Sequence, residues 1–240
     1  MAVNYTFQRV EKKYMLSPEQ YEQFISEIKP YMQLDEYGLH TICNIYYDTM
    51  TNELIRTSIE KPRYKEKLRL RSYGIPDDDS TVFIEIKKKF NGVVFKRRVS
   101  MQHDEAMAYI ESGIRPDFEN QILFEIDYFM QHYKPIPKLF LAYDRMAYFG
   151  RQDSEIRMTF DRNIRSRPYD LDLTHGDYGE KLMDEDNVLL EIKVPMAYPI
   201  WLTKILSKLE IYPISFSKYG NIYKENVMKK RSIEQCLQVF

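Results

Sequence analysis

The sequence contains, at positions 65 to 71, the stretch Lys65-Glu66-Lys67-Leu68-Arg69-Leu70-Arg71. Side chains of a β-strand alternate between its two faces, so residues two apart point the same way. If this stretch is a strand, both leucines lie on one face. The opposite face then carries only cations, which are Lys65, Lys67, Arg69 and Arg71. Such a strand packs its apolar face inside the protein and presents a row of positive charge on the other face.

The same alternation, a polar and mostly basic face opposite an apolar face, recurs along the chain. We predict further strands of this kind over residues 7–16, 81–90, 92–100, 138–149, 155–166 and 187–194. Each of them has polar residues in one phase of the two-residue period. Their polar faces carry Arg9, Glu11 and Lys13, then Glu85, Lys87 and Lys89, then Lys96 and Arg98, then Tyr143 and Arg145, then Arg157, Thr159 and Asp161, and finally Glu191 and Lys193.

An open antiparallel sheet with its polar face in water is the simplest interpretation of any one of these strands. Several strands with Arg and Lys in the same phase, however, repel one another unless an anion lies between them. A barrel with a basic interior removes this conflict, because its lumen can bind a polyanion. We therefore expect an α+β fold in which a closed antiparallel β-barrel of about eight strands forms a basic tunnel, with helices packed outside.

Local signals predict the helices and the remaining strands. Ser17-Pro18-Glu19-Gln20 combines an N-cap, a proline at the first helical position and a capping-box glutamine. Asn91-Gly92 predicts a tight hairpin, the centre of an antiparallel meander. Runs of strands with helices inserted between them favour α+β over a parallel sheet. Further strands are expected at 40–48 and 64–73, and further helices at 103–112, 117–133, 198–209 and 217–230.

Charge is distributed unevenly over the 240 residues. The formal net charge is -1, which excludes a globally basic nucleic-acid-binding protein. Residues 61–98 nevertheless hold twelve basic and five acidic residues, a local charge of +7, so an anion site has to be local.

No apolar run approaches the roughly 20 residues of a membrane-spanning helix, and no secretory signal is visible. The length and the absence of a linker predict one domain over residues 1–240. The only two cysteines cannot make a disulfide framework, so we expect the cytoplasm as its compartment.

Eight short motifs follow one another along the chain. They are Arg9-Val10-Glu11-Lys12-Lys13-Tyr14, Lys67–Tyr73, Phe83–Lys87, Lys96-Arg97-Arg98, Tyr143–Tyr148, Glu155–Asp161, Leu190–Lys193 and Phe216-Ser217-Lys218-Tyr219. Together they resemble the triphosphate tunnel metalloenzymes and, within them, the polyphosphate polymerase (VTC) domain. The first motif is similar to the R-x-E-x-K-Y opening of VTC domains. It differs from the E-x-E-x-K of the adenylate cyclase and thiamine triphosphatase branch, because position 9 is arginine.

The resemblance implies roles for individual residues. Glu191 would bind the catalytic Mn²⁺ or Mg²⁺, with Arg9, Glu11 and Glu85 in support. Ser215 stands where the eukaryotic branch carries a lysine, so we expect the tunnel exit or the affinity for product to differ. For the hairpin, the choice between Lys96 and Arg98 stays open. The catalytic set would be Arg69, Arg71, Lys87, Arg145 and Lys218, and further phosphate contacts would come from Lys13, Lys96, Arg98, Arg157 and Lys193.

The resemblance also implies an activity, an ATP-dependent transferase that adds the γ-phosphate of ATP to a growing inorganic polyphosphate chain and releases ADP. Residue types alone also allow a tunnel triphosphatase or polyphosphatase, or a module that binds a polyanion without turnover. The expected partners are ATP and polyphosphate, not nucleic acid. We expect no direct membrane span, and a membrane-protein partner and the oligomeric state are left open.

Overall fold

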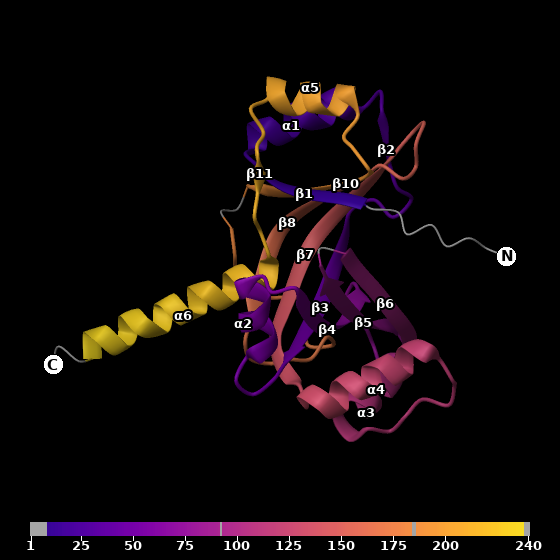
Figure 1. Ribbon diagram of the computed structural model, residues 1–240, viewed down its shortest axis with the longest axis vertical. Coiled ribbons are helices and arrows are strands. Elements are labelled where there is room, and N and C mark those ends of the chain that lie inside the picture. Colours follow the sequence, from indigo (N-terminus) through magenta and orange to yellow (C-terminus); the bar gives the residue numbers. More distant parts are fainter. Residues whose placement is uncertain (1–8, 92, 184–185, 238–240) are drawn as a thin grey trace. The chain divides into compact units, whose positions relative to one another are not determined.

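The computed structural model describes residues 9–91, 93–183 and 186–237, which form an α+β structure with a large antiparallel sheet (Figure 1). The strands are β1 (Arg9–Leu16), β2 (Met32–Leu34), β3 (His40–Asp48), β4 (Tyr64–Tyr73), β5 (Thr81–Phe90), β6 (Val93–Gln102), β7 (Ile136–Gly150), β8 (Arg157–Arg167), β9 (Glu180–Lys181), β10 (Val188–Pro195) and β11 (Pro213–Ile214). The helices are α1 (Pro18–Ile28), α2 (Glu53–Glu60), α3 (His103–Ser112), α4 (Gln121–Tyr133), α5 (Ile200–Lys208) and α6 (Lys218–Leu237).

The strands are linked in the order β11-β1-β10-β8-β7-β3-β4-β5-β6, with β2 added to β7 and β9 added to β8. This path has two ends, β11 and β6, and within the described residues no pairing joins them. The expected closed barrel was therefore wrong as a statement about backbone pairing. The alternation of charge predicts which residues share a face, but closure depends on hydrogen bonds between the two end strands, which side-chain patterns do not encode.

The chain divides into two compact units. The first unit combines the described residues of 1–41, 143–164 and 181–216, and the second combines the described residues of 42–142, 165–180 and 217–240. Each has its own apolar core of buried side chains. Within the described residues, no helix is both long and apolar enough to cross a membrane.

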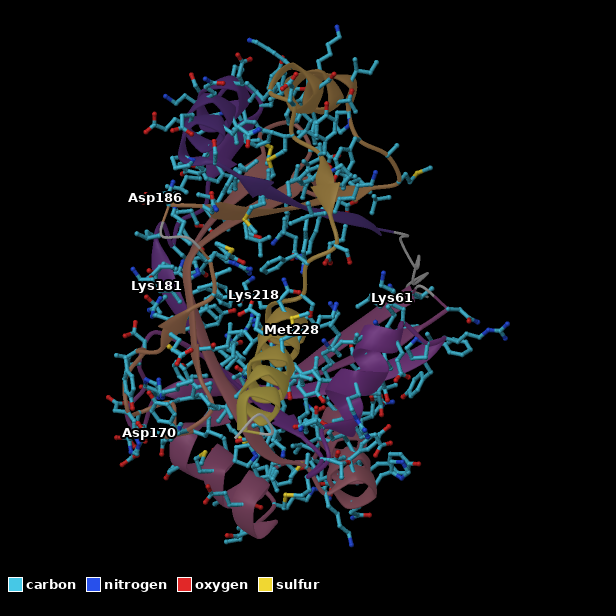
Figure 2. The ribbon with its side chains drawn as sticks, turned by 90° about the vertical axis from the view of Figure 1, so that its left-hand side faces the viewer. Lys61, Asp170, Lys181, Asp186, Lys218 and Met228 are labelled. Atoms are coloured by element: carbon cyan, nitrogen blue, oxygen red, sulfur yellow. The ribbon has the colours of Figure 1, made fainter. Side chains whose placement is uncertain are left out.

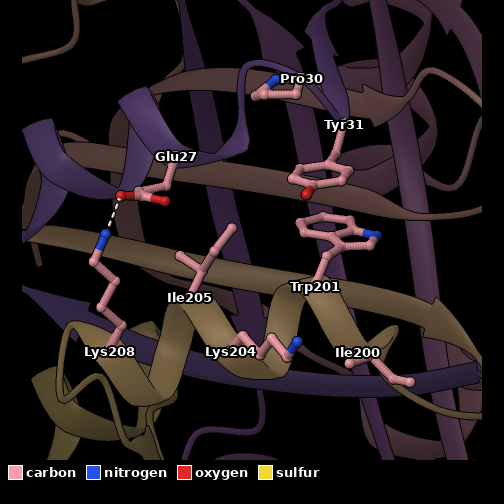
Figure 3. Close-up of a pocket in the computed structure, with 8 residues that line it drawn as sticks. All are labelled: Glu27, Pro30, Tyr31, Ile200, Trp201, Lys204, Ile205 and Lys208. Atoms are coloured by element: carbon pink, nitrogen blue, oxygen red, sulfur yellow. Dashed lines mark hydrogen bonds and ion pairs between the residues drawn. The ribbon is translucent and has the colours of Figure 1, made fainter.

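In the first unit, β1 pairs with β10 and β10 with β8, and α1 and α5 lie side by side against this sheet (Figure 1). The predicted capping box is confirmed, because Ser17 Oγ accepts from the backbone N–H of Gln20 and the Gln20 side chain accepts from that of Ser17. Tyr31 stacks on Trp201 beside a pocket of about 460 Å³ (Figure 3). No residue of the predicted phosphate site lines this pocket.

In the second unit, β4, β5 and β6 form the predicted antiparallel meander, and α3 and α4 pack against it. Apolar side chains of all three strands are buried in one core with side chains of these helices, leucines and isoleucines from β4 and β5 and Val99 and Met101 from β6. Gly113 ends α3 with a φ of 70°, which glycine adopts without the steric cost of a Cβ atom. Helix α4 begins at Gln121 rather than at 117, since the side chain of Asn120 caps it by accepting from the N–H of Ile122.

Helix α2 was not predicted, and its start is explained by a buried carboxylate at the end of β3. Asp48 Oδ1 accepts from the backbone N–H of Leu54, and Asp48 Oδ2 accepts from that of Ile55. These are orphan donors of a helix N-terminus, where negative charge is also favourable. The cap comes from a preceding strand, so the usual sequence signal next to the helix is missing. The short strands β2, β9 and β11 were missed as well, because two or three residues show no period.

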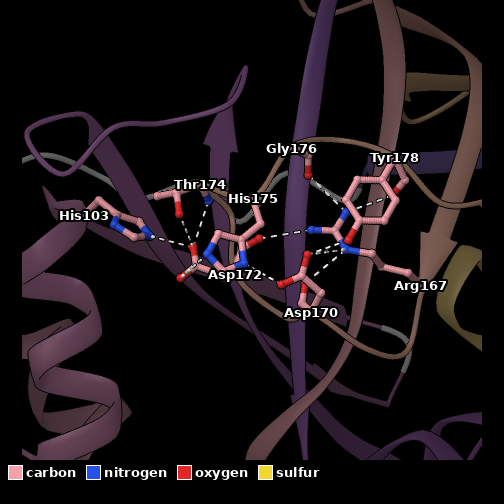
Figure 4. Close-up of polar contacts among 8 residues, drawn as sticks. All are labelled: His103, Arg167, Asp170, Asp172, Thr174, His175, Gly176 and Tyr178. Atoms are coloured by element: carbon pink, nitrogen blue, oxygen red, sulfur yellow. Dashed lines mark hydrogen bonds and ion pairs between the residues drawn. The ribbon is translucent and has the colours of Figure 1, made fainter.

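Residues 168–179 of the second unit are organised by one buried arginine (Figure 4). Arg167, at the end of β8, has no exposed surface, and its guanidinium donates to the backbone carbonyls of Asp170, Asp172, Gly176 and Tyr178. The same group lies between the rings of Phe140 and Tyr178, 3.7 and 4.2 Å from their centroids. Arg167 therefore holds the loop by hydrogen bonds that a sequence motif does not reveal.

Candidate phosphate-binding clusters

In the second unit, cations of neighbouring strands lie directly opposite one another. In the registers of β4 with β5 and of β5 with β6, Lys67 is opposite Lys87, and Lys87 is opposite Lys96. Two residues further along the same face, Lys65 is opposite Lys89. Like charges in such positions destabilise a sheet by mutual repulsion. The predicted cationic face therefore exists, and an anionic ligand on it would relieve the repulsion.

Glu85 of β5 lies in the middle of this face with its carboxylate buried. Arg69 donates to Glu85 Oε2 from Nε and Nη2, at 2.7 and 2.5 Å. The side chains of Arg71 and Lys96 lie 3.7 and 3.5 Å from Glu85 Oε1. Burial alone would raise the pKa of Glu85, but Arg69 and the neighbouring cations lower it to about 2. Glu85 is thus a permanent anion that holds three of the predicted phosphate-binding residues in place.

Strand β3 supplies two more side chains that hold the arginines. The side-chain oxygen of Asn44 accepts from Arg71 Nε at 3.0 Å, and the phenol oxygen of Tyr46 accepts from Arg69 Nη1 at 3.1 Å. Burial would raise the pKa of Tyr46, but the positive charges of Arg69 and Lys67 lower it to about 8. The cations of this face therefore outweigh the effect of burial on the Tyr46 phenol.

Lys218 begins α6 and is half-buried (Figure 2). The next residue ties the helix start to the unit, because Tyr219 donates to Asp48 Oδ2 at 3.1 Å. The Tyr219 ring lies 4.9 Å from the ring of Tyr46 and has Lys67 Nζ 6.0 Å from its centroid. Asp48 therefore accepts hydrogen bonds both from the N-terminal amides of α2 and from Tyr219 at the start of α6.

The hairpin residues of the predicted site differ in their surroundings. Lys96 faces Glu85, whereas the guanidinium of Arg98 lies 4.5 Å from the Phe83 ring and donates to the Tyr73 hydroxyl at 3.4 Å. Lys96 is therefore the hairpin cation that belongs to the Glu85 cluster. Lys87, opposite Lys67 and Lys96 in the strand registers, lies on the same face as Lys96 and is exposed.

The first unit holds a second cluster around Glu191 of β10. Lys13 Nζ lies 3.6 Å from Glu191 Oε2, and Lys193 forms an ion pair with Oε1. Burial acts to raise the pKa of Glu191, but Lys193 and Lys13 lower it well below its ordinary value. Lys13 also donates to the carbonyl of Phe216 at 3.2 Å, which ties the last motif to β1. The predicted metal ligand is thus ionised and surrounded by cations.

Arg145 of β7 is held by a residue of the neighbouring strand β8. Its Nε and Nη2 donate to the two oxygens of Asp161, at 2.6 and 2.8 Å, a bidentate pair that fixes the guanidinium plane. Arg157 is exposed and lies opposite Lys193 in the register of β8 with β10, and Glu11 is exposed opposite Lys193 on the β1 side. The side chain of Arg9 lies outside the described residues.

In the Glu191 cluster, the carboxylate that could bind a divalent metal ion is that of Glu191 itself. Among the described residues no group of three or more His, Cys, Asp or Glu side chains could hold a metal ion. Mg²⁺, however, is usually bound by one or two carboxylates, with water and substrate phosphates as further ligands. Thr159 lies opposite Glu191, and its buried hydroxyl has no hydrogen-bond partner. An ionised carboxylate beside an unsatisfied hydroxyl fits a metal that arrives with a phosphate ligand.

Sequence reasoning missed Asn44 and Tyr46, and it placed Asp161 on a polar face without assigning it the task of holding Arg145. A signal for Asn44 and Tyr46 exists. In β3, the residues Asn44, Tyr46 and Asp48 alternate with apolar residues, and the register places Asn44 opposite Arg71 and Tyr46 opposite Arg69. Buried polar side chains need partners, so such positions in a strand next to an arginine strand are candidates for holding it.

Comparison with known proteins identifies the family. The family model described as the VTC domain matches residues 8–226. A candidate adenylate cyclase from Bacillus halodurans shares 15% identity, with 87% of this chain and 93% of that one covered and a TM-score of 0.55. A candidate adenylyl cyclase from Hippeastrum, described as having a dominant triphosphatase activity, shares 13% identity, with 91% and 96% covered and a TM-score of 0.57. No curated protein matches.

At these identities the solved structures show a shared fold, that of the triphosphate tunnel metalloenzymes. Members of that group use divalent metal ions, and their fold binds triphosphate substrates. The family match covers both clusters described above, from Lys13 to Lys218. Because it also spans most of the sequence, the chain belongs to the VTC domain family.

Proposed function

We propose that the protein is a metal-dependent polyphosphate polymerase that uses ATP. The observation that carries this proposal is the VTC domain match over residues 8–226, which includes Glu191. Glu191 is kept ionised by Lys193 and Lys13, so it stays available as a hard oxygen ligand at neutral pH. The proposed substrates are ATP and inorganic polyphosphate.

Both clusters suit the binding of phosphate groups. Phosphoryl transfer needs little covalent help from a protein, because positioning and neutralisation of charge supply most of the catalysis. Arg69, Arg71 and Arg145 are held by Glu85, Asn44 and Asp161, so their guanidinium groups are oriented before a ligand arrives. Arginine binds phosphate oxygens by two parallel hydrogen bonds, whereas lysine acts as a point charge. We assign phosphate contacts to Lys13, Lys87, Lys96, Arg98, Arg157, Lys193 and Lys218 as well.

The proposed step is an in-line displacement at the γ-phosphorus of ATP. A terminal oxygen of the polyphosphate chain forms a new P–O bond to this phosphorus, and the bond from the phosphorus to the β–γ bridging oxygen breaks. ADP leaves with that bond's electron pair, and the chain is longer by one phosphate. The arginines and lysines neutralise charge on the equatorial and leaving oxygens. A Mn²⁺ or Mg²⁺ ion held by Glu191 would supply further charge neutralisation on the phosphates.

The test is incubation of the purified protein with γ-labelled ATP and Mn²⁺ or Mg²⁺, followed by separation of the products on a gel. We expect a ladder of labelled polyphosphate. Glu191→Gln removes the negative charge with little change in shape, and we expect it to abolish the ladder. Glu27→Gln is the matched control, because Glu27 is a carboxylate of the same unit that forms an ion pair with Lys208, 2.6 Å away. A ladder of equal strength from Glu191→Gln would refute the assigned role.

A triphosphatase is the second candidate, and the activity described for the Hippeastrum protein favours it. In that case water replaces the polyphosphate terminus as the nucleophile, and labelled orthophosphate appears without a ladder. Tight binding of triphosphate with no turnover would instead indicate a binding module. Arg69→Ala and Arg145→Ala, one in each cluster, are expected to weaken triphosphate binding in calorimetry under all three functions. Unchanged affinity in both variants would remove the phosphate-binding assignment itself.

A further inference from the structure

One end of the cationic face, away from the hairpin between β5 and β6, carries flat side chains. Phe83 of β5 lies opposite Arg71 in the strand register, and Tyr73 follows Arg71 on the same face of β4. The rings of Tyr73 and Phe83 meet edge to face, with centroids 5.6 Å apart and an interplanar angle of 81°. The guanidinium of Arg98 lies 4.5 Å from the centroid of the Phe83 ring and donates to the Tyr73 hydroxyl at 3.4 Å. We call Tyr73, Phe83 and Arg98 the ring cluster.

The ring cluster is open to solvent. Tyr73 is 50% exposed, Arg98 is exposed, and Phe83 is half-buried beneath Arg98. Because one face of the guanidinium packs on Phe83, the opposite face and the Tyr73 ring are the flat surfaces that a ligand can reach. Aromatic rings and arginine planes bind nucleobases by stacking, and such stacking tolerates any base because every base has a π-face.

The ring cluster adjoins the Glu85 cluster on the same face of the sheet. Arg98 is opposite Glu85 in the register of β5 with β6. Arg71, whose guanidinium lies 3.7 Å from Glu85 Oε1, is the same-face neighbour of Tyr73 on β4. Same-face neighbours along a strand are about 7 Å apart, a step that the ribose of a nucleotide can span. A phosphate held by Arg71 therefore has a stacking surface within reach of the rest of a nucleotide.

The two directions away from Glu85 differ in chemistry. Toward the hairpin, β4 and β5 carry lysines on this face, in the opposed pairs Lys67 with Lys87 and Lys65 with Lys89. In the other direction the ring cluster takes their place. A ligand that suits both directions carries a flat ring system at one end and several phosphates at the other. A nucleoside triphosphate has this form, whereas inorganic polyphosphate has no ring to stack.

We propose that Tyr73 and Arg98, with Phe83 beneath Arg98, form a stacking site for the nucleobase of ATP, from which the triphosphate extends toward Lys67 and Lys87. This site rests on the function proposed above, because it places the ATP of that function on the cationic face. A guanidinium donates hydrogen bonds in its plane and stacks through its faces. The phosphate contact assigned to Arg98 and the stacking therefore use different parts of the same group.

The test compares two ligands by calorimetry under the same metal-ion conditions. One is adenosine β,γ-imidotriphosphate, an ATP analogue that resists transfer of its γ-phosphate, and the other is inorganic triphosphate, which has no base. The double variant Tyr73→Leu/Arg98→Lys removes both flat surfaces but keeps apolar bulk and positive charge. We expect it to raise the Kd of the analogue at least about tenfold more than the Kd of triphosphate, because stacking of the base is lost.

The matched control is Tyr64→Leu/Arg97→Lys, the same two changes on the opposite face of this sheet, which should leave the ratio of the two Kd values as in the original protein. An unchanged ratio in Tyr73→Leu/Arg98→Lys would overturn the base site, and triphosphate binding by the original protein would still leave the proposed function standing. If the original protein binds neither ligand, the proposed function and the base site are overturned together. Circular dichroism checks that each variant is folded.

Discussion

At the scale of single residues, Tyr46 shows how the site creates its electrostatic potential. The phenol oxygen accepts a hydrogen bond from Arg69, and Lys67 and Arg71 lie close enough to stabilise the phenolate further. Among the described tyrosines whose pKa departs from the ordinary value, the others have a raised pKa, for Tyr178 because of its hydrogen bond to Asp170 and for the rest chiefly because of burial. The pKa of Tyr46 is therefore lower than those of the other shifted tyrosines, and its titration reports on the positive charge around it.

We predict a tyrosinate absorbance step near pH 8 that is missing in Tyr46→Phe. Bound triphosphate brings negative charge to Arg69, which offsets the cations that stabilise the phenolate, so the step should move to higher pH. Ultraviolet difference spectra over a pH titration, with and without triphosphate, measure both effects. Tyr73→Phe is the control, because this exposed tyrosine contacts Arg98 outside the Glu85 cluster. A step that persists in Tyr46→Phe would contradict the assignment.

At the scale of elements, Arg167 connects β8 to the loop that follows it. Its guanidinium satisfies four backbone carbonyls that lie within a few residues of one another, and its plane is packed between two rings. Lysine has the same charge but cannot reach four acceptors from one point. The loop therefore depends on the shape of the arginine side chain more than on its charge.

We predict that Arg167→Lys lowers the free energy of unfolding by about 2 kcal/mol or more, because at least two hydrogen bonds of about 1 kcal/mol each are lost. Urea unfolding measures this loss, and limited proteolysis should show earlier cleavage within residues 168–179. Arg151→Lys is the matched control, since Arg151 donates to only two carbonyls, those of Lys29 and Met32, at the protein surface. Equal stability of the two variants would show that Arg167 does not organise the loop.

At the scale of the whole molecule, each unit keeps one ionised carboxylate among cations. The pKa of Glu85 falls to about 2 from an ordinary 4.5, and that of Glu191 falls in the same direction. A carboxylate with a lowered pKa stabilises the folded state above the pKa of the unfolded chain. That stability is lost as pH falls through the folded pKa, here between 4.5 and about 2. The shift of Glu85 corresponds to about 3 kcal/mol.

We therefore predict that the free energy of unfolding falls steeply between about pH 4.5 and about pH 2, with a smaller fall in Glu85→Gln. Near neutral pH this variant should be less stable than the original protein by about 3 kcal/mol, because Arg69 and Arg71 lose their anion. Urea unfolding at several pH values measures both effects. Glu66→Gln is the control, since Glu66 pairs with a single lysine, Lys88. Parallel pH curves for Glu85→Gln and the original protein would contradict this account.

Local patterns predicted most of the elements. The two-residue period placed the strands of the meander, and their register confirms that cations share one face. The capping box at Ser17 and the glycine at 113 marked a helix start and a helix end that the structure confirms. These signals work because each depends on residues a few positions apart. Helix α2 was not predicted, because its capping residue Asp48 lies in the preceding strand, six residues before Leu54, and not next to the helix.

The sequence by itself determined the alternation of cationic and apolar residues, the family and the residue types available for phosphate. Only the tertiary structure decided which partners hold these residues. Arg69 is paired with Glu85 and Tyr46, and Arg145 with Asp161, through strand registers that no single stretch encodes. The open ends of the sheet, β11 and β6, were likewise a tertiary outcome. The physical reason is that pairing joins residues far apart in the chain, and its free energy depends on packing that alternation does not specify.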